Sequence, residues 1–126
     1  MATQSFENLV VYRLSEQLAD VVWDICAAYQ PFARDTVGKQ LVRAVDSVGA
    51  NIAEGFGRGT YADNKRFIRI ARGPLYETQH FLRRSYRRKL LTAADTDRIR
   101  KLIADLRPRL NAYLKSIGTR KRPNDQ

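Results

Sequence analysis

The side chains best suited to chemistry in this sequence are basic ones, gathered in its second half. They recur at steps of three or four residues, which places them on one side of a helix. This basic stripe consists of Lys65, Arg69, Arg72, Tyr76, Gln79, Arg83 and Arg87. Its charge is broadened by Arg66, Arg84, Arg88 and Lys89 and, further along the chain, by Arg98, Arg100, Lys101, Arg107 and Arg109. Glu77 is the only acidic residue between Lys65 and Asp95, so the sequence offers the stripe little local neutralisation.

Such a stripe is suited to binding phosphate. Arginine predominates over lysine, and its planar guanidinium makes bidentate contacts with phosphate and stacks on bases. Tyr76 and Tyr86 add rings on which unpaired bases can stack. No recognition-helix motif or nucleic-acid-binding module is visible, so we expect RNA or DNA to be bound largely without sequence specificity. The residues expected to bind are Lys65, Arg69, Arg72, Tyr76, Arg83, Arg84, Arg87 and Arg88.

Positive charge alone does not identify the partner. A cationic surface also suits acidic proteins or lipid headgroups. The alternative interpretation is therefore a structural protein–protein interaction module with no nucleic-acid ligand.

Catalytic and metal-binding chemistry lack the necessary sets of residues. Glu54 has no second acid and no nucleophile and base to work with. His80 is the only histidine and Cys26 the only cysteine, so neither has the neighbours that would complete a metal site. The glycines at 55, 57 and 59 lack the spacing of a phosphate-binding loop and follow no strand. We therefore expect a non-enzymatic protein without metal or cofactor.

Length and charge indicate one basic domain. The 126 residues suit a single hydrophobic core. Residues 1–63 hold 5 basic and 8 acidic side chains and residues 64–126 hold 18 and 5, so the halves carry net charges of −3 and +13. With one cysteine, no export signal and no run of ~18 apolar residues, a cytoplasmic protein without a membrane span is expected. We expect a flexible N-terminus at 1–5, a helical bundle at 6–118 and a disordered basic tail at 119–126.

Apolar periodicity divides the domain into four helices. Apolar side chains recur every three or four positions in residues 6–29, 36–54 and 61–89, and again from Thr92 or Asp95 to Gly118. Short connections predict that neighbouring helices run antiparallel, in an all-α, up-down-up-down four-helix bundle. The residues of the third helix expected to point inward are Phe67, Ile70, Ala71, Leu75, Thr78, Phe81, Leu82 and Ser85.

Prolines and glycines mark the expected ends and irregularities of these helices. Pro31 is expected to close the first helix, and the three glycines of 55–59 to end the second and form a tight turn. Gly73-Pro74 predicts a kink or short break in the third helix, and Pro108 a bend in the fourth.

The first helix is apolar on a second side as well. Tyr12 and Trp23 lie on this second side, away from the apolar residues of the first helix that face the core. This pattern predicts an interface with another subunit, while the alternative is that both rings pack at the edge of the bundle.

Two segments carry a recognisable signature, SVGANIAEGFGR at 47–58 and FIRIARGPLYET at 67–78. With FENLVVY at 6–12 and QLVRA at 40–44, they resemble the bacterial four-helix bundle proteins of the 23S ribosomal RNA intervening sequence family. The resemblance covers roughly residues 6–115 and departs from the family at Pro74, where serine usually follows the glycine.

The resemblance implies a cytoplasmic bundle that assembles as a homopentamer. A more distant relative is the accessory variability protein of diversity-generating retroelements, which binds nucleic acid and partners a reverse transcriptase. The implied partners are therefore further copies of the chain, nucleic acid and, where its gene is a neighbour, a reverse transcriptase. Because a fold hosts many functions, the family indicates the fold more securely than the activity.

The signature residues are interpreted as structural. Folding the second and third helices back on each other brings Arg43 near Glu77, so an interhelical ion pair is expected, with Ser47, Ala50 and Ala71 small enough for close approach. Asn51 is expected to bond backbone across helices, and Glu54 to pair with Arg58 or cap the turn. The full set is Arg43, Ser47, Asn51, Glu54, Gly55, Gly57, Arg58 and Glu77.

Overall fold

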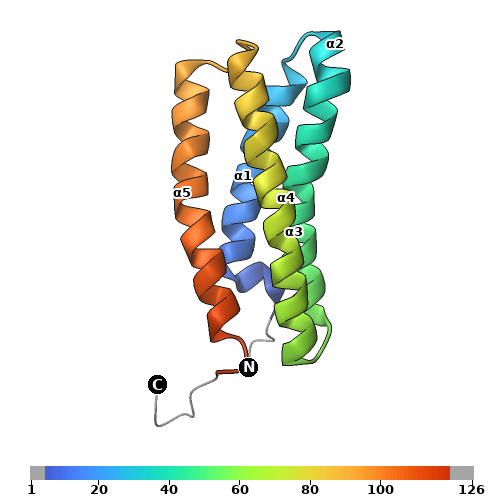
Figure 1. Ribbon diagram of the computed structural model, residues 1–126, viewed down its shortest axis with the longest axis vertical. Helices are drawn as coiled ribbons and strands as arrows, with labels where there is room; N and C mark the ends of the chain where they lie inside the picture. Colours follow the sequence, from blue (N-terminus) through green and yellow to red (C-terminus); the bar gives the residue numbers. More distant parts are fainter. Residues whose placement is uncertain (1–4, 120–126) are drawn as a thin grey trace.

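The computed structural model of the chain describes residues 5–119, which contain helices and no strand. Four long helices lie side by side (Figure 1), α1 (Val10–Ala27), α3 (Lys39–Gly57), α4 (Tyr61–Arg87) and α5 (Ala93–Ser116). Consecutive long helices run in opposite directions, so the predicted all-α, up-down-up-down bundle is confirmed. α3 packs against α1 and α4, whereas α5 packs mainly against α1 and only sparsely against α4. Most of the expected flexible N-terminus and basic tail lies outside the described residues.

The first helix begins later than the sequence predicts. Phe6–Asn8 form a single 3-10 turn, η1, in which the Ser5 hydroxyl accepts a hydrogen bond from the backbone N–H of Glu7 at 3.2 Å. Leu9 is extended, with φ −73° and ψ 130°, and α1 starts after it. The Phe6 ring packs edge-on against Tyr12, with ring centroids 4.8 Å apart, and this contact holds the turn against the helix.

Pro31 begins a helical segment instead of closing one. α1 ends at Ala27, and from Pro31 onward α2 (Pro31–Ala33), the π-helical segment η2 (Arg34–Gly38) and α3 follow without interruption. Proline is tolerated in a first turn because the N–H that it lacks would have no helical partner there. The helix predicted at 36–54 is therefore longer at both ends.

Only one of the three clustered glycines makes the turn after α3. The helix continues through Gly55 and Gly57, and of the three only Gly59 has a positive φ, of 91°. Gly55 is buried, and a Cβ on it would lie 2.8 Å from Asn64 Oδ1 and 2.9 Å from Phe67 Cβ. Its missing side chain therefore lets α3 and α4 approach each other closely.

Neither internal proline breaks its helix. α4 is continuous through Pro74 and α5 through Pro108, so the short break expected near residue 73 is absent. Thr78 Oγ1 donates a hydrogen bond to the carbonyl oxygen of Pro74 at 2.8 Å.

Threonines cap the two C-terminal helices. The Thr60 hydroxyl accepts a hydrogen bond from the N–H of Asp63 at 3.1 Å, and the Thr92 hydroxyl accepts one from the N–H of Asp95 at 3.0 Å. Of the two predicted starts of α5, Thr92 is therefore the cap. Gly118, with a φ of 81°, follows the end of α5 as predicted.

The core lies between the four long helices. The side of α4 that faces the core differs slightly from the predicted one. Ile70 is 41% exposed, so its predicted inward position is wrong, and Ile68 is fully buried in its place. Ile68 continues the three- and four-residue steps of Ala71 and Leu75, whereas Ile70 is rotated away from them. Phe67 is half-buried. Within residues 5–119 no helix combines the length and the apolar character needed to cross a membrane.

Candidate nucleic-acid interface

The basic stripe lies on the outer side of α4. Its exposed members are Arg69, Arg72, Tyr76, Arg83 and Arg87. Lys65 and Gln79 are half-buried. Within residues 5–119, no basic side chain of the stripe forms an ion pair with a carboxylate. The stripe therefore presents unneutralised positive charge to the solvent.

Two members of the stripe contact α5. Arg107 Nη2 donates a hydrogen bond to the Tyr76 hydroxyl at 3.3 Å, and its guanidinium carbon lies 5.2 Å from the centre of the Tyr76 ring. Arg72 Nη1 donates to Asn111 Oδ1 at 3.3 Å. One face of Tyr76 is therefore already occupied by a cation. Tyr86, 55% exposed, has no cation–π contact in the described part of the chain.

α5 adds positive charge beside the stripe. Its arginines without an ion pair in the described chain are Arg98, Arg100 and Arg107. Lys101, by contrast, pairs with Asp97 at 3.1 Å, and Arg109 pairs with Asp105 at 2.7 Å. These exposed pairs sit one turn apart on the helix and neutralise that charge locally. Of the three arginines without an ion pair, Arg100 and Arg107 line the side of α5 that faces α4 and extend the unneutralised surface of α4.

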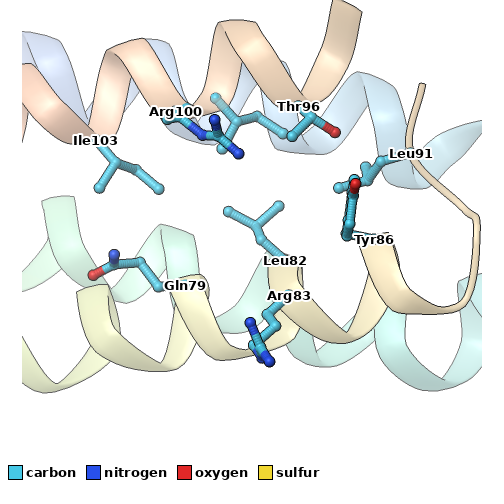
Figure 2. A pocket seen from close by; sticks show the side chains of 9 residues that line it. Gln79, Leu82, Arg83, Tyr86, Leu91, Thr96, Arg100 and Ile103 are labelled. Atoms are coloured by element: carbon cyan, nitrogen blue, oxygen red, sulfur yellow. The ribbon is translucent and has the colours of Figure 1, made fainter. Parts of the chain in front are cut away.

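A groove runs between α4 and α5 beneath these charges. Figure 2 shows Leu82 of α4 pointing across it toward α5, where Arg100 and Ile103 lie on the opposite wall. One part measures about 330 Å³ and is lined by Gln79, Leu82, Arg83, Tyr86, Leu91, Thr96, Ile99, Arg100 and Ile103. An adjoining part of about 450 Å³ shares three of these residues and is lined by Gln79, Arg100, Ile103, Ala104, Arg107, Pro108 and Asn111. We call these two parts the α4–α5 groove.

Arg84 and Arg88, two of the predicted binding residues, lie on the other side of α4. Together with Arg43 and His80 they line a hollow of about 630 Å³ between α3 and α4. Asp35 is the only carboxylate in this lining. Three of the eight predicted binding residues therefore border hollows on the two sides of α4, Arg83 on one side and Arg84 and Arg88 on the other.

His80 and Cys26 belong to no metal-binding cluster in the described chain. No group of three or more His, Cys, Asp or Glu residues there is placed to hold a metal ion. His80 is exposed and packs edge-on against Phe81. Cys26 is buried, and burial raises the pKa of its thiol to about 11. Because the thiolate is the reactive form, Cys26 is an inert core residue at neutral pH.

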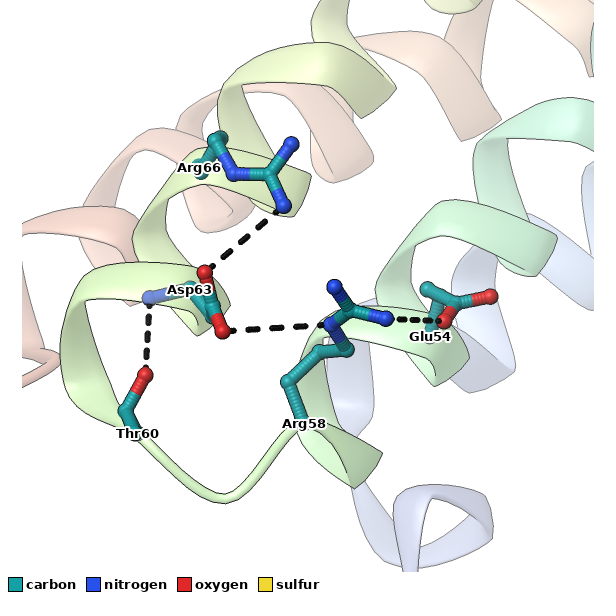
Figure 3. A network of polar contacts seen from close by, with 5 residues as sticks. All are labelled: Glu54, Arg58, Thr60, Asp63 and Arg66. Carbon is teal, nitrogen blue, oxygen red and sulfur yellow. Dashed lines mark hydrogen bonds and ion pairs between the residues drawn. The ribbon is translucent and has the colours of Figure 1, made fainter.

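Signature residues at the α3–α4 turn form a polar network (Figure 3). Arg58 pairs with Glu54 at 3.4 Å and with Asp63 at 3.9 Å, and Arg66 pairs with Asp63 at 3.6 Å. The predicted pairing of Glu54 with Arg58 is therefore confirmed. Arg58 and Arg66 also lie over the Phe67 ring, 5.0 and 4.7 Å from its centre. Because each pair is exposed, it contributes no more than about 1 kcal/mol to stability.

No ion pair joins Arg43 and Glu77 among the described residues, so that prediction is wrong. Both side chains are exposed, and Arg43 lies in the hollow beside His80 instead. Glu77 follows the buried Leu75 by two residues, which is about 200° around a helix. It therefore points away from the core into solvent.

Two further predictions about the signature need correction. Asn51 Nδ2 donates to the carbonyl oxygen of Ser47 at 2.8 Å, within its own helix and not across to another. Ala71 is fully buried, but Ala50 is exposed and lies on the side of α3 that faces α1. The small residue that allows close approach of α3 and α4 at their turn is Gly55.

The predicted interface residues Tyr12 and Trp23 lie in separate hollows on the side of α1 and α3. Tyr12 is half-buried, and its hollow is also lined by Glu16, Asp20 and Asp46. Burial, and then the charge of Asp20, raises the pKa of Asp46 above its usual value. Trp23 is 61% exposed. The hollow beside Tyr12 is therefore acidic, opposite in sign to α4 and α5, whereas the hollow beside Trp23 is lined by Arg34 and Lys39 and by no carboxylate.

Periodicity alone could not reveal the α4–α5 groove. Leu91 and Thr96 belong to a loop and to another helix, and only the folded chain places them opposite Tyr86. The sequence gives one indication of the groove, which is Gln79, an uncharged polar residue in the middle of the basic stripe.

The fold and the site define a class of protein, a four-helix bundle with an arginine-rich face. The chain matches the family model of the 23S rRNA-intervening sequence protein over residues 7–112, and it belongs to that family. The match includes the turn network, the basic stripe and most of α5, so the predicted family is confirmed. No curated protein matches the chain.

Proposed function

We propose that this chain is a non-enzymatic scaffold protein that binds RNA or DNA largely without sequence specificity, through the basic stripe and the neighbouring arginines of α5. The observation that carries the proposal is the row of exposed stripe arginines that have no carboxylate partner within residues 5–119. Such side chains bind the phosphates of any sequence, and phosphate contacts dominate non-specific affinity. The name of the family favours structured RNA as the natural ligand.

We also propose that the protein acts in the cytoplasm as a homopentamer. Support comes from large apolar side chains that a subunit contact would cover, Trp23 at 61% exposure and Phe32 at 82%. A ring would repeat the basic stripe around its axis, and several weak phosphate contacts would then act together through avidity.

Fluorescence anisotropy with single-stranded RNA, hairpin RNA and duplex DNA tests nucleic-acid binding. The logarithm of the affinity is expected to fall linearly with the logarithm of the salt concentration. Arg83→Glu/Arg87→Glu should weaken binding at moderate salt by about tenfold or more, since it reverses two phosphate-binding charges.

Arg13→Glu/Arg34→Glu is the matched control, because it makes the same change in net charge on α1 and η2, away from the stripe. This control should bind much more tightly than the stripe variant. Equal losses in the two variants would contradict a localised interface. Absence of binding even at low salt would contradict the proposal and favour the protein–protein interaction module instead.

A further inference from the structure

We propose that the α4–α5 groove receives an unpaired base of a single-stranded nucleic acid, so that the protein prefers single strands and loops to duplexes. This inference rests on the proposed function and adds to it the class of ligand and the place where the base lies.

The floor of the groove suits the face of a base. It is formed by Leu82 of α4 and by Ile99 and Ile103 of α5. Base faces stack on flat or apolar protein surfaces when they are unpaired, whereas in a duplex the neighbouring base pairs cover them. A single strand or a loop can therefore place a base between α4 and α5, and an intact duplex cannot.

The edges of the groove suit the backbone that carries the base. Arg100 lines both parts of the groove, Arg83 borders one part and Arg107 the other, and neither lining contains a carboxylate. In Figure 2, Arg83, a member of the basic stripe, extends away from α5. Phosphates that follow the stripe thus pass beside the groove, within reach of arginines on both helices.

Two further side chains provide recognition groups. Tyr86 is 55% exposed at one end of the groove, where its ring can stack on the base. The Gln79 Oε1 atom is buried and has no hydrogen-bond partner in the structure. Because the last torsion of a glutamine side chain is broad, the amide can turn toward a base edge and gain the hydrogen bond that it lacks.

The other hollow beside α4 suits phosphate better than a base. Its lining is mainly polar and charged, with the basic residues Lys39, Arg43, Arg84 and Arg88, and its apolar members are only Val37 and Phe81. The apolar floor is thus the feature that distinguishes the α4–α5 groove as the place for a base.

The test compares the affinity of a single-stranded RNA with that of a duplex of the same sequence, with 2-aminopurine fluorescence reporting whether a base leaves its stack. Tyr86→Ala removes the stacking ring, and Thr96→Phe fills the groove, without any change of charge. Each should weaken single-strand binding about fivefold or more and leave duplex binding unchanged. Tyr61→Ala is the matched control, since Tyr61 is 57% exposed on the same helix and lies outside the groove lining. Circular dichroism verifies that each variant is folded.

The outcomes separate this inference from the proposed function. Equal wild-type affinity for single strand and duplex, or unchanged single-strand binding by both groove variants, overturns the groove as a base site. If Arg83→Glu/Arg87→Glu still weakens binding by about tenfold or more in that case, the proposed function stands. Failure of the wild-type protein to bind any nucleic acid overturns both.

Discussion

Gly55 stands where α3 and α4 meet near their shared turn, and the structure leaves no room there for a side chain. An added Cβ would approach Asn64 Oδ1 to 2.8 Å and Phe67 Cβ to 2.9 Å, so at least one of the helices would have to shift. Gly57, two residues later in the same helix, has no atom within 4 Å of an added Cβ. At the scale of the residue, two glycines of one motif therefore serve different purposes.

Substituting these glycines separates the two roles. Gly55→Ala is expected to lower the free energy of unfolding by about 1–3 kcal/mol, because it overpacks the contact between α3 and α4. Gly57→Ala is expected to be neutral or to stabilise by up to ~1 kcal/mol, because alanine is the better helix former and meets nothing. Urea denaturation of both variants measures the difference. Equal stabilities would show that α3 and α4 can separate locally without cost.

At the scale of the element, α4 carries both the stripe and an internal proline. Pro74 cannot donate the helical hydrogen bond to Ile70, and its ring crowds the preceding turn, yet α4 continues through it. The carbonyl oxygen of Pro74 accepts a hydrogen bond from the Thr78 hydroxyl, in the turn after the proline and not in the preceding turn, where the backbone bond is missing. The helix is therefore maintained by its packing against α3 and the core and not by its local hydrogen bonds alone.

Replacing this proline should stabilise the protein. Pro74→Ala is expected to raise the free energy of unfolding by about 1–3 kcal/mol, since it restores a backbone donor in the interior of a helix. Pro31→Ala, in the first turn of α2, restores no such bond and should change stability by less than about 1 kcal/mol. Thermal unfolding followed by circular dichroism compares the two. A lower melting temperature for Pro74→Ala would mean that the local geometry requires proline.

At the scale of the whole molecule, the charge is divided between two sides of the bundle. Acidic residues surround Tyr12 on α1 and α3, and arginines without a carboxylate partner in residues 5–119 lie along the basic stripe of α4 and extend onto α5. An exposed tryptophan, Trp23, lies in a separate hollow beside α1 and α3, away from the proposed nucleic-acid interface. Self-assembly through α1 would therefore leave the arginine-rich face open for a ligand.

Light scattering tests this arrangement. The wild-type mass is expected to be about five times the 14.5 kDa of one chain, and Trp23→Asp should lower it toward that of the monomer by placing a charge in the contact. Tyr61→Asp, a matched change of an exposed aromatic residue on α4, should leave the mass unchanged. A monomeric wild-type protein would contradict assembly.

A feature could be predicted from the sequence when the residues that form it lie close together along the chain. The caps at Thr60 and Thr92 and the pairing of Glu54 with Arg58 were predictable because each connects residues no more than four positions apart. The ion pair between Arg43 and Glu77 was predicted wrongly, because a contact between helices depends on their rotation as well as on their alignment. The same reason explains why Ile68, and not Ile70, faces the core.

Four antiparallel helices, a signature that identifies the family and a basic stripe on the third long helix could all be predicted from the amino-acid sequence. These features depend on periodicity and on local motifs, which a single helix already expresses. The packing of the helices placed Arg83 beside one hollow and Arg84 and Arg88 beside another, and gave the first an apolar floor formed by Leu82, Ile99 and Ile103. That floor exists because α5 packs mainly on α1 and leaves its side toward α4 partly uncovered, an arrangement that no single helix encodes.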